Sequence, residues 1–186
     1  MLRRLVLVAA LAGSMLAPAS AAAQSEPLQA ALDWLRTQQQ ADGGFSNGFV
    51  PGSDPGATAD AVLAIASAGQ DAAQWTTGGN APLDALRAAV ESGAVTGAGG
   101  FAKVALAVQA AGQDVRSFGG VDLPAAILAD RKDGGGLFGG GPYDTALAMQ
   151  ALLASGGALP DGVIDSLLAT RLPDGAYAFN GDLTPG

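Results

Sequence analysis

The sequence predicts an all-α repeat domain in which apolar inner helices alternate with amphipathic outer helices. Three apolar segments of equal length align on a terminal glycine, at residues 58–69, 101–112 and 145–156, with offsets of 43 and 44 residues. A period in the low forties that contains two helices is a signature of helical repeat proteins. No run of alternating β-branched residues is long enough to indicate a sheet, since Val95-Thr96 is too short.

The first outer helix is expected just after residue 25, ahead of a pair of glycines. Its apolar side chains recur at helical spacing and form one face: they are Leu28, Ala31, Leu32 and Leu35. Pro27 is tolerated in a first turn, and Gly43 with Gly44 ends the segment. The inner helices differ because they are apolar almost all round, as buried helices are.

Three further amphipathic segments separate or follow the inner helices. Each has apolar residues at helical spacing and carries charged residues on its other face; they span residues 83–92, 123–130 and 163–172. The sequence therefore predicts four outer and three inner helices, about seven in all.

Residues 1–23 are interpreted as a secretory signal peptide and residues 24–186 as the domain. Arg3 and Arg4 precede an apolar run at 5–17, and the small residues that follow suit a signal peptidase. As a helix the run would span about 20 Å, short of the roughly 30 Å of a bilayer core. We therefore expect an extracytoplasmic protein (secreted, periplasmic or at the cell surface) with no stable membrane span after cleavage. An uncleaved amino-terminal anchor is the alternative.

Composition excludes several kinds of chemistry. The chain has Cys 0 and His 0, so it can form no disulfide, no thiolate nucleophile and no metal site built on Cys or His. We expect no metal and no cofactor. The formal net charge is −8 and Lys and Arg do not cluster, which argues against nucleic-acid binding because phosphate contacts need a basic surface.

The segment at residues 34–45, WLRTQQQADGGF, carries a recognisable motif whose residues are Trp34, Gln39, Gly43 and Phe45. It resembles the QW repeat of squalene cyclases and protein prenyltransferase β-subunits, with Phe45 where that repeat usually has Trp. Two degenerate copies follow, in which Lys132 and Arg171 replace the glutamine. Their other motif residues are Gly136 with Phe138 and Gly175 with Tyr177.

The chain is also similar to exported bacterial prenyltransferase/squalene-oxidase-repeat proteins, which are related in fold to cobalamin carriers. This resemblance is carried by the block at residues 103–123 and covers about residues 28–186. It implies the terpenoid cyclase superfamily and an α/α toroid, an inner ring of helices inside an outer ring with a central cavity. A full toroid has six helix pairs, so an incomplete ring is implied. We expect either a fragment truncated at its carboxyl end or an open arc that self-associates through uncovered terminal helices.

The residues behind the family's known activities are missing. No Asp-x-Asp-Asp motif occurs, and the Asp, Cys and His zinc ligands of the prenyltransferases cannot be assembled. Five acids are expected at helix starts or beside them, where carboxylates cap free N–H groups: they are Asp54, Asp60, Asp144, Asp174 and Asp182. The alternative is that two of them face each other across the cavity as an acid/base pair.

Four residues are the candidates for ligand binding: Asp60, Lys103, Asp144 and Trp75. Lys103 occupies the inner-helix position equivalent to Asp60, and we expect it to pair with an acid, with an anionic ligand as the alternative. Trp75 lies in a polar loop and is expected to be an exposed stacking platform. Trp34 lies on an apolar helix face and is expected in the core.

These features favour an exported, non-catalytic binding or structural module, with a corrinoid-like small molecule as the specific ligand hypothesis. The alternative is an enzyme of the α/α-toroid class, terpene cyclase-like or a lyase or hydrolase, that works through Asp residues in the cavity.

Overall fold

The computed structural model of the chain describes residues 25–132 and 136–177. The expected signal peptide and Asp182 lie outside these residues. The described part is helical, with only isolated β-bridges besides. Its helices are α1 (Glu26–Thr37), α2 (Pro55–Ser67), η1 (a 3-10 turn at Ala72–Gln74), α3 (Pro82–Glu91), α4 (Gly97–Ala110), α5 (Leu123–Ala129), α6 (Pro142–Ala154) and α7 (Val163–Ala169). The prediction of an all-α fold with about seven helices is confirmed.

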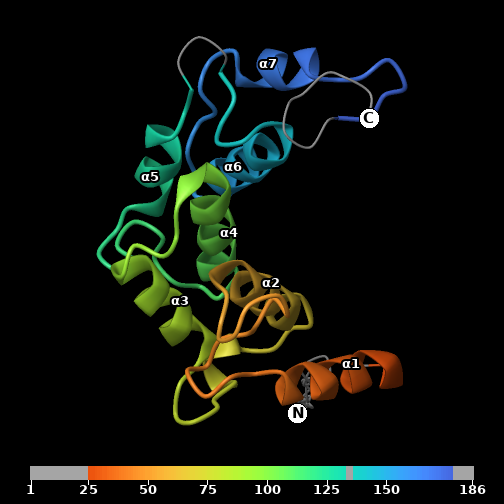
Figure 1. Cartoon of the computed structure of the whole chain (residues 1–186), viewed down its shortest axis with the longest axis vertical. Coiled ribbons are helices and arrows are strands. Elements are labelled where there is room, and N and C mark those ends of the chain that lie inside the picture. The colour runs from red at the N-terminus through yellow and green to blue at the C-terminus, as the bar shows by residue number, and fades with distance from the viewer. Residues whose placement is uncertain (1–24, 133–135, 178–186) are drawn as a thin grey trace, which may run out of the picture.

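The helices form an open arc (Figure 1). Helices α2, α4 and α6 pack side by side along its concave side, with α4 in the middle, while α3 and α5 pack against their convex side. Helices α1 and α7 lie at the two ends of the arc. Apolar inner helices therefore alternate with amphipathic outer ones, and closure of the arc into a toroid stays a prediction.

The inner helices begin three or four residues earlier than the repeat alignment indicates. Pro55 and Pro142 occupy the first turns of α2 and α6, where the missing N–H costs nothing and the fixed φ suits a helix. Asp54 caps α2 by accepting the Ala57 N–H at 2.8 Å. The alignment missed these residues because the first turn of α4 is rich in glycine and lacks the proline that begins α2 and α6.

Small side chains let the inner helices approach closely. The buried residues of α4 are all alanine, glycine or valine, because this helix has an inner neighbour on each side: Ala98, Gly99, Ala102, Val104, Ala105, Ala107 and Val108. Gly99 is required for the contact with α6, since a Cβ there would lie 2.7 Å from the carboxyl carbon of Asp144. Close packing of this kind replaces the large aromatic anchors that the chain lacks.

An isolated bridge closes each of the three motif copies. Isolated bridges pair Gln39 with Phe45 and Arg171 with Tyr177. In the middle copy the partner of Phe138 is Arg131, so the expected assignment of Lys132 to the glutamine position is wrong. This loop contains one residue more than the other two, and the sequence alignment placed that residue on the wrong side of the bridge.

The motif glycine is fixed by geometry. Gly43 has φ +87°, a left-handed conformation that side chains disfavour. A Cβ there would also lie 2.7 Å from the carbonyl carbon of Ala81. Gly136 and Gly175 have φ +70° and +92°, so all three copies need glycine for the same backbone reason.

A buried threonine joins each of the first two motif loops to the following inner helix. The Phe45 N–H donates to Thr58 Oγ1 at 2.9 Å, and the Phe138 N–H donates to Thr145 Oγ1 at the same distance. Each hydroxyl in turn donates to a carbonyl one turn earlier in the chain. Thr58 and Thr145 are 1% and 0% exposed, so water cannot replace these bonds.

We expect Thr58→Val and Thr145→Val each to lower the free energy of unfolding by about 1–3 kcal/mol, because the isosteric change leaves a buried N–H without an acceptor. Urea denaturation followed by circular dichroism measures the loss. Thr37→Val is the control: its hydroxyl donates to the Trp34 carbonyl and accepts from Gln38 Nε2, and both bonds are exposed to water, so the effect is expected within about 0.5 kcal/mol. Equal effects at buried and exposed sites would contradict the role given to the buried hydroxyls.

We expect Gly43→Ala to be more destabilising than Gly48→Ala. Both positions have positive φ, which costs about 1–2 kcal/mol for alanine. A Cβ at Gly48 meets nothing within 4 Å, whereas at Gly43 it meets backbone. The difference between the two midpoints in urea therefore isolates the steric overlap, and equal midpoints would contradict it.

Candidate functional site

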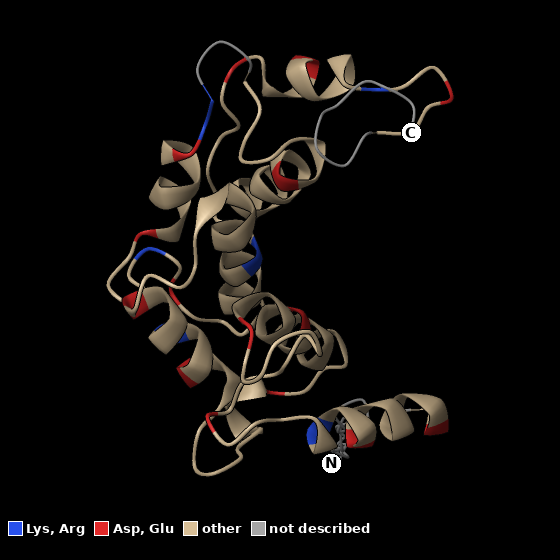
Figure 2. Cartoon of the chain, viewed as in Figure 1, with Lys and Arg blue, Asp and Glu red and all other residues tan. Residues whose placement is uncertain are grey.

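Two of the predicted ligand-binding residues form an ion pair on the inner helices. Lys103 Nζ of α4 lies 2.7 Å from Asp60 Oδ2 of α2, with side chains 25% and 58% exposed. Lys103 is the one cation of α4, visible as the blue segment of that helix in Figure 2. The expected ion pair is confirmed. Asp60 lies in the second turn of α2, so the expectation that it caps a helix start is wrong.

The pKa of Lys103 reports the balance of this pair. Partial burial lowers this pKa. The hydrogen bond to Asp60 and the negative charge of Asp60 together raise it by more than burial lowers it, so the pKa stands above its ordinary value of 10.5. Smaller contributions from Tyr143 and Asp54 act in the same direction. The ammonium therefore remains charged throughout the physiological range.

Asp144 has a structural contact in the first turn of α6. Its Oδ2 accepts the Gly140 N–H at 2.6 Å, and its carboxyl group packs against Gly99 of α4. The expectation that Asp144 caps a free backbone N–H at a helix start is confirmed, because its carboxylate accepts the N–H of a residue just before α6. Asp174 acts similarly in its loop by accepting the Ala176 N–H at 2.9 Å.

The two tryptophans are placed opposite to the prediction. Trp75 is 1% exposed: its Nε1 donates to Gln70 at 2.9 Å, and the Arg36 guanidinium lies 4.0 Å from its ring centroid. Gln39 helps to hold this loop in place by donating to the Trp75 carbonyl at 2.8 Å. Trp34 is 63% exposed. The Trp75 ring is buried because its polar loop folds back onto α1. The Trp34 ring is exposed because the apolar face of α1 has little to pack against.

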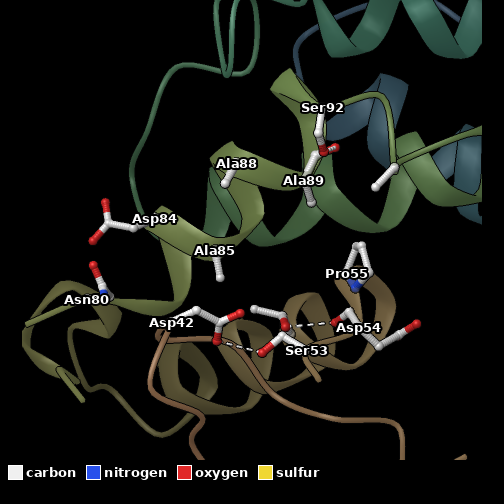
Figure 3. A pocket seen from close by; sticks show the side chains of 12 residues that line it. Asp42, Ser53, Asp54, Pro55, Asn80, Asp84, Ala85, Ala88, Ala89 and Ser92 are labelled. Atoms are coloured by element: carbon white, nitrogen blue, oxygen red, sulfur yellow. Dashed lines mark hydrogen bonds between the residues drawn. The ribbon is translucent and has the colours of Figure 1, made fainter. Parts of the chain in front are cut away.

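One pocket lies between the loop that follows α1 and the outer helix α3 (Figure 3). Its volume is about 510 Å³, and α3 and the residues after it supply an apolar wall of alanines: Ala85, Ala88, Ala89 and Ala94. The polar lining residues come from the loop after α1, from the start of α2, and from α3 and the residues at its two ends: they are Asp42, Ser53, Asp54, Thr58, Asn80, Asp84 and Ser92. None of the lining residues is basic.

Three carboxylates are held around this pocket by backbone contacts. Asp42 accepts the Ser53 hydroxyl at 2.7 Å and the Gly44 N–H at 3.0 Å. Asp54 is the cap of α2, and Asp84 accepts the Ala81 N–H at 2.9 Å in the first turn of α3. These bonds fix the positions of the acids, so the pocket presents a preformed negative edge beside an apolar wall.

A second groove lies between α1 and α2, with a volume of about 390 Å³. Trp34 and Leu35 line one side, and Ala57, Ala61 and Ala64 line the other. Asp60 also lines this groove, the only one of the four predicted ligand-binding residues that lines either hollow. The structure thus joins Asp60 to Lys103 but brings neither Asp144 nor Trp75 to the pockets.

The pocket on α3 was missed by sequence reasoning, although a signal existed. Small residues recur on α3 and just after it at positions 85, 88, 89 and 92, a second face beside the apolar one formed by Leu83, Leu86 and Val90. Another acid was missed entirely: Asp130, at the end of α5, accepts the Ala98 N–H at 2.7 Å and so caps α4 across the fold.

Within the described residues, no group of three His, Cys, Asp or Glu side chains could hold a metal ion. Nor does any helix there combine the length and apolar character that crossing a bilayer requires. Comparisons of the chain with models of protein families, with curated proteins and with solved structures give no match.

We expect Asp60→Asn and Lys103→Met each to reduce the free energy of unfolding by about 0.5–1 kcal/mol, the range of partly exposed ion pairs. A double-mutant cycle in urea measures their coupling. Because the folded-state pKa of Lys103 is raised, the contribution is complete below pH 10.5 and is lost as pH rises through the folded-state pKa. A coupling of zero at neutral pH, or one that grows above that pH, would contradict the pairing.

Proposed function

We propose that the chain is an exported, non-catalytic repeat module that binds a small molecule in the pocket between α3 and the loop after α1. The observation that carries the proposal is the combination of an alanine wall with acids held in fixed positions. Apolar pockets of about 300–1,000 Å³ with a few convergent polar groups are the usual form of a small-molecule site. Export rests on the features of residues 1–23.

The chemistry of the lining favours a small organic cation. The alanine wall suits an apolar body, and Asp42, Asp54 and Asp84 suit an ammonium group. No basic lining residue competes for these carboxylates from within the pocket, although Arg87 approaches Asp84 at 3.4 Å on the exposed side. The formal net charge of −8 adds long-range attraction for a cation.

Catalysis by Asp residues receives less support. An acid/base pair needs two carboxylates that converge on one substrate with room for it between them. Asp60 is paired with Lys103, and Asp144 is bound to backbone. The acids of the α3 pocket likewise serve as caps or turn acceptors.

A corrinoid remains the ligand that the family resemblance implies. It is larger than a drug-sized molecule, so it fits the concave side of the arc, near the Asp60–Lys103 pair, better than the α3 pocket. The uncovered apolar side chains at the ends of the arc additionally favour self-association.

We expect isothermal titration to detect binding of small amines such as benzylamine and choline. Ala88→Leu should weaken this binding at least tenfold, about 1.4 kcal/mol, because Ala88 is exposed and leucine fills the pocket without touching the core. Ala125→Leu, on the exposed side of α5, is the matched control and should bind as the unaltered chain does.

Cyanocobalamin is titrated in parallel. If cobalamin binds and Ala88→Leu does not weaken that binding, the result would indicate a cobalamin site on the concave side of the arc instead of the α3 pocket. No heat beyond dilution from amines or cobalamin, or equal weakening in both leucine variants, would overturn the proposed pocket.

A further inference from the structure

Each end of the arc leaves large apolar side chains uncovered. At the carboxyl-terminal end they are Leu153, Ile164 and Leu168, which are 56%, 52% and 54% exposed. At the amino-terminal end they are Leu28 and Trp34, 37% and 63% exposed. Together these residues define a carboxyl-terminal end face on α6 and α7 and an amino-terminal end face on α1 and α2.

The exposed Leu153 of α6 occupies a position that α4 uses to contact its next neighbour. In the repeat alignment, Leu153 is equivalent to Gln109. Gln109 of α4 donates a hydrogen bond to the Ala154 carbonyl of α6. The same helix side that holds α6 onto α4 is therefore left open on α6.

The amino-terminal end face is open because α2 has no inner helix before it within the described residues. Ala107 of α4 and Ala151 of α6 are equivalent and are both 0% exposed. Ala151 lies two turns beyond Asp144, on the side of α6 that meets α4. The equivalent residue of α2 is Ala64, which is exposed and lines the groove between α1 and α2. That groove is thus the side on which α4 and α6 each receive the preceding inner helix.

We propose that the carboxyl-terminal end face of one copy of this chain docks on the amino-terminal end face of a second copy, with the inner helix α6 of the first beside α2 of the second. The proposal does not depend on the ligand pocket.

The partner is a second copy because the two end faces are counterparts by repetition. Inside the chain, α2 against α4 and α4 against α6 are the same interface repeated, so α6 against a second α2 continues it. In repeat proteins each unit buries its apolar face only on its neighbours, and an uncapped end is left to associate. The groove offers alanines to receive Leu153, and Trp34 beside them can cover further apolar area.

Such a contact joins two different surfaces. It produces a closed ring when two or more copies complete a turn, and an open filament when they do not. The ring and the filament both contain the same head-to-tail interface, so the experiment tests for that interface.

Sedimentation velocity on the purified full chain, over a wide range of concentrations, gives the mass. We expect a species of at least twice the single-chain mass. Leu153→Glu and Ala64→Glu each place a carboxylate in one end face at a position exposed in the single chain, and each variant alone should sediment as a monomer. Circular dichroism establishes that both fold. Leu128→Glu, at an exposed position of α5 away from both faces, should leave the mass unchanged.

Mixing the two end-face variants is the decisive measurement. Each keeps one intact face, so the mixture should form a heterodimer and nothing larger. A monomeric unaltered chain would overturn the proposal. Persistence of dimer in either variant alone would indicate a symmetric contact through one face and would also overturn it.

Discussion

Contact between the small-residue faces of α2, α4 and α6 is the constraint on which the arc depends. Alanine and glycine bring the inner helices close together, and the outer helices then cover the convex side. The bond from the Phe45 N–H to Thr58 sets how the motif loop after α1 enters α2, and the Phe138 bond to Thr145 repeats this before α6. Loop and helix are therefore positioned together, which fixes where the loop residues meet α3 and form the pocket.

The acids of this chain act chiefly on backbone. Asp54 begins α2, Asp144 binds the turn before α6, and Asp130 reaches from α5 to the first turn of α4. A carboxylate at such a position stabilises a free N–H and the positive end of the helix. A high acid content is thus compatible with a module that binds rather than reacts. The same bonds hold the carboxylates still, as a preorganised site for a cationic ligand requires.

An open arc leaves each terminal unit with one neighbour fewer than the central one. Helix α4 is covered on both sides, while α6 leaves Leu153 exposed and α2 leaves Ala64 exposed. The proposed binding and the proposed assembly therefore draw on different parts of the molecule: the α3 pocket is built within the arc, and the end faces lie on its outermost described helices. A ligand effect and an association effect can be separated by substitution for this reason.

Sequence by itself determined the helical class, the alternation of apolar and amphipathic helices, and the glycines at 43, 136 and 175, because these depend on local periodicity and backbone conformation. It also predicted that Lys103 pairs with an acid, whereas the packing of α4 on α2 decided that this acid is Asp60. Tertiary structure alone decided the exposure of Trp34 and Trp75, the Asp130 cap and the pocket on α3. Each of these depends on which segment folds back onto which helix, and no local pattern carries that information.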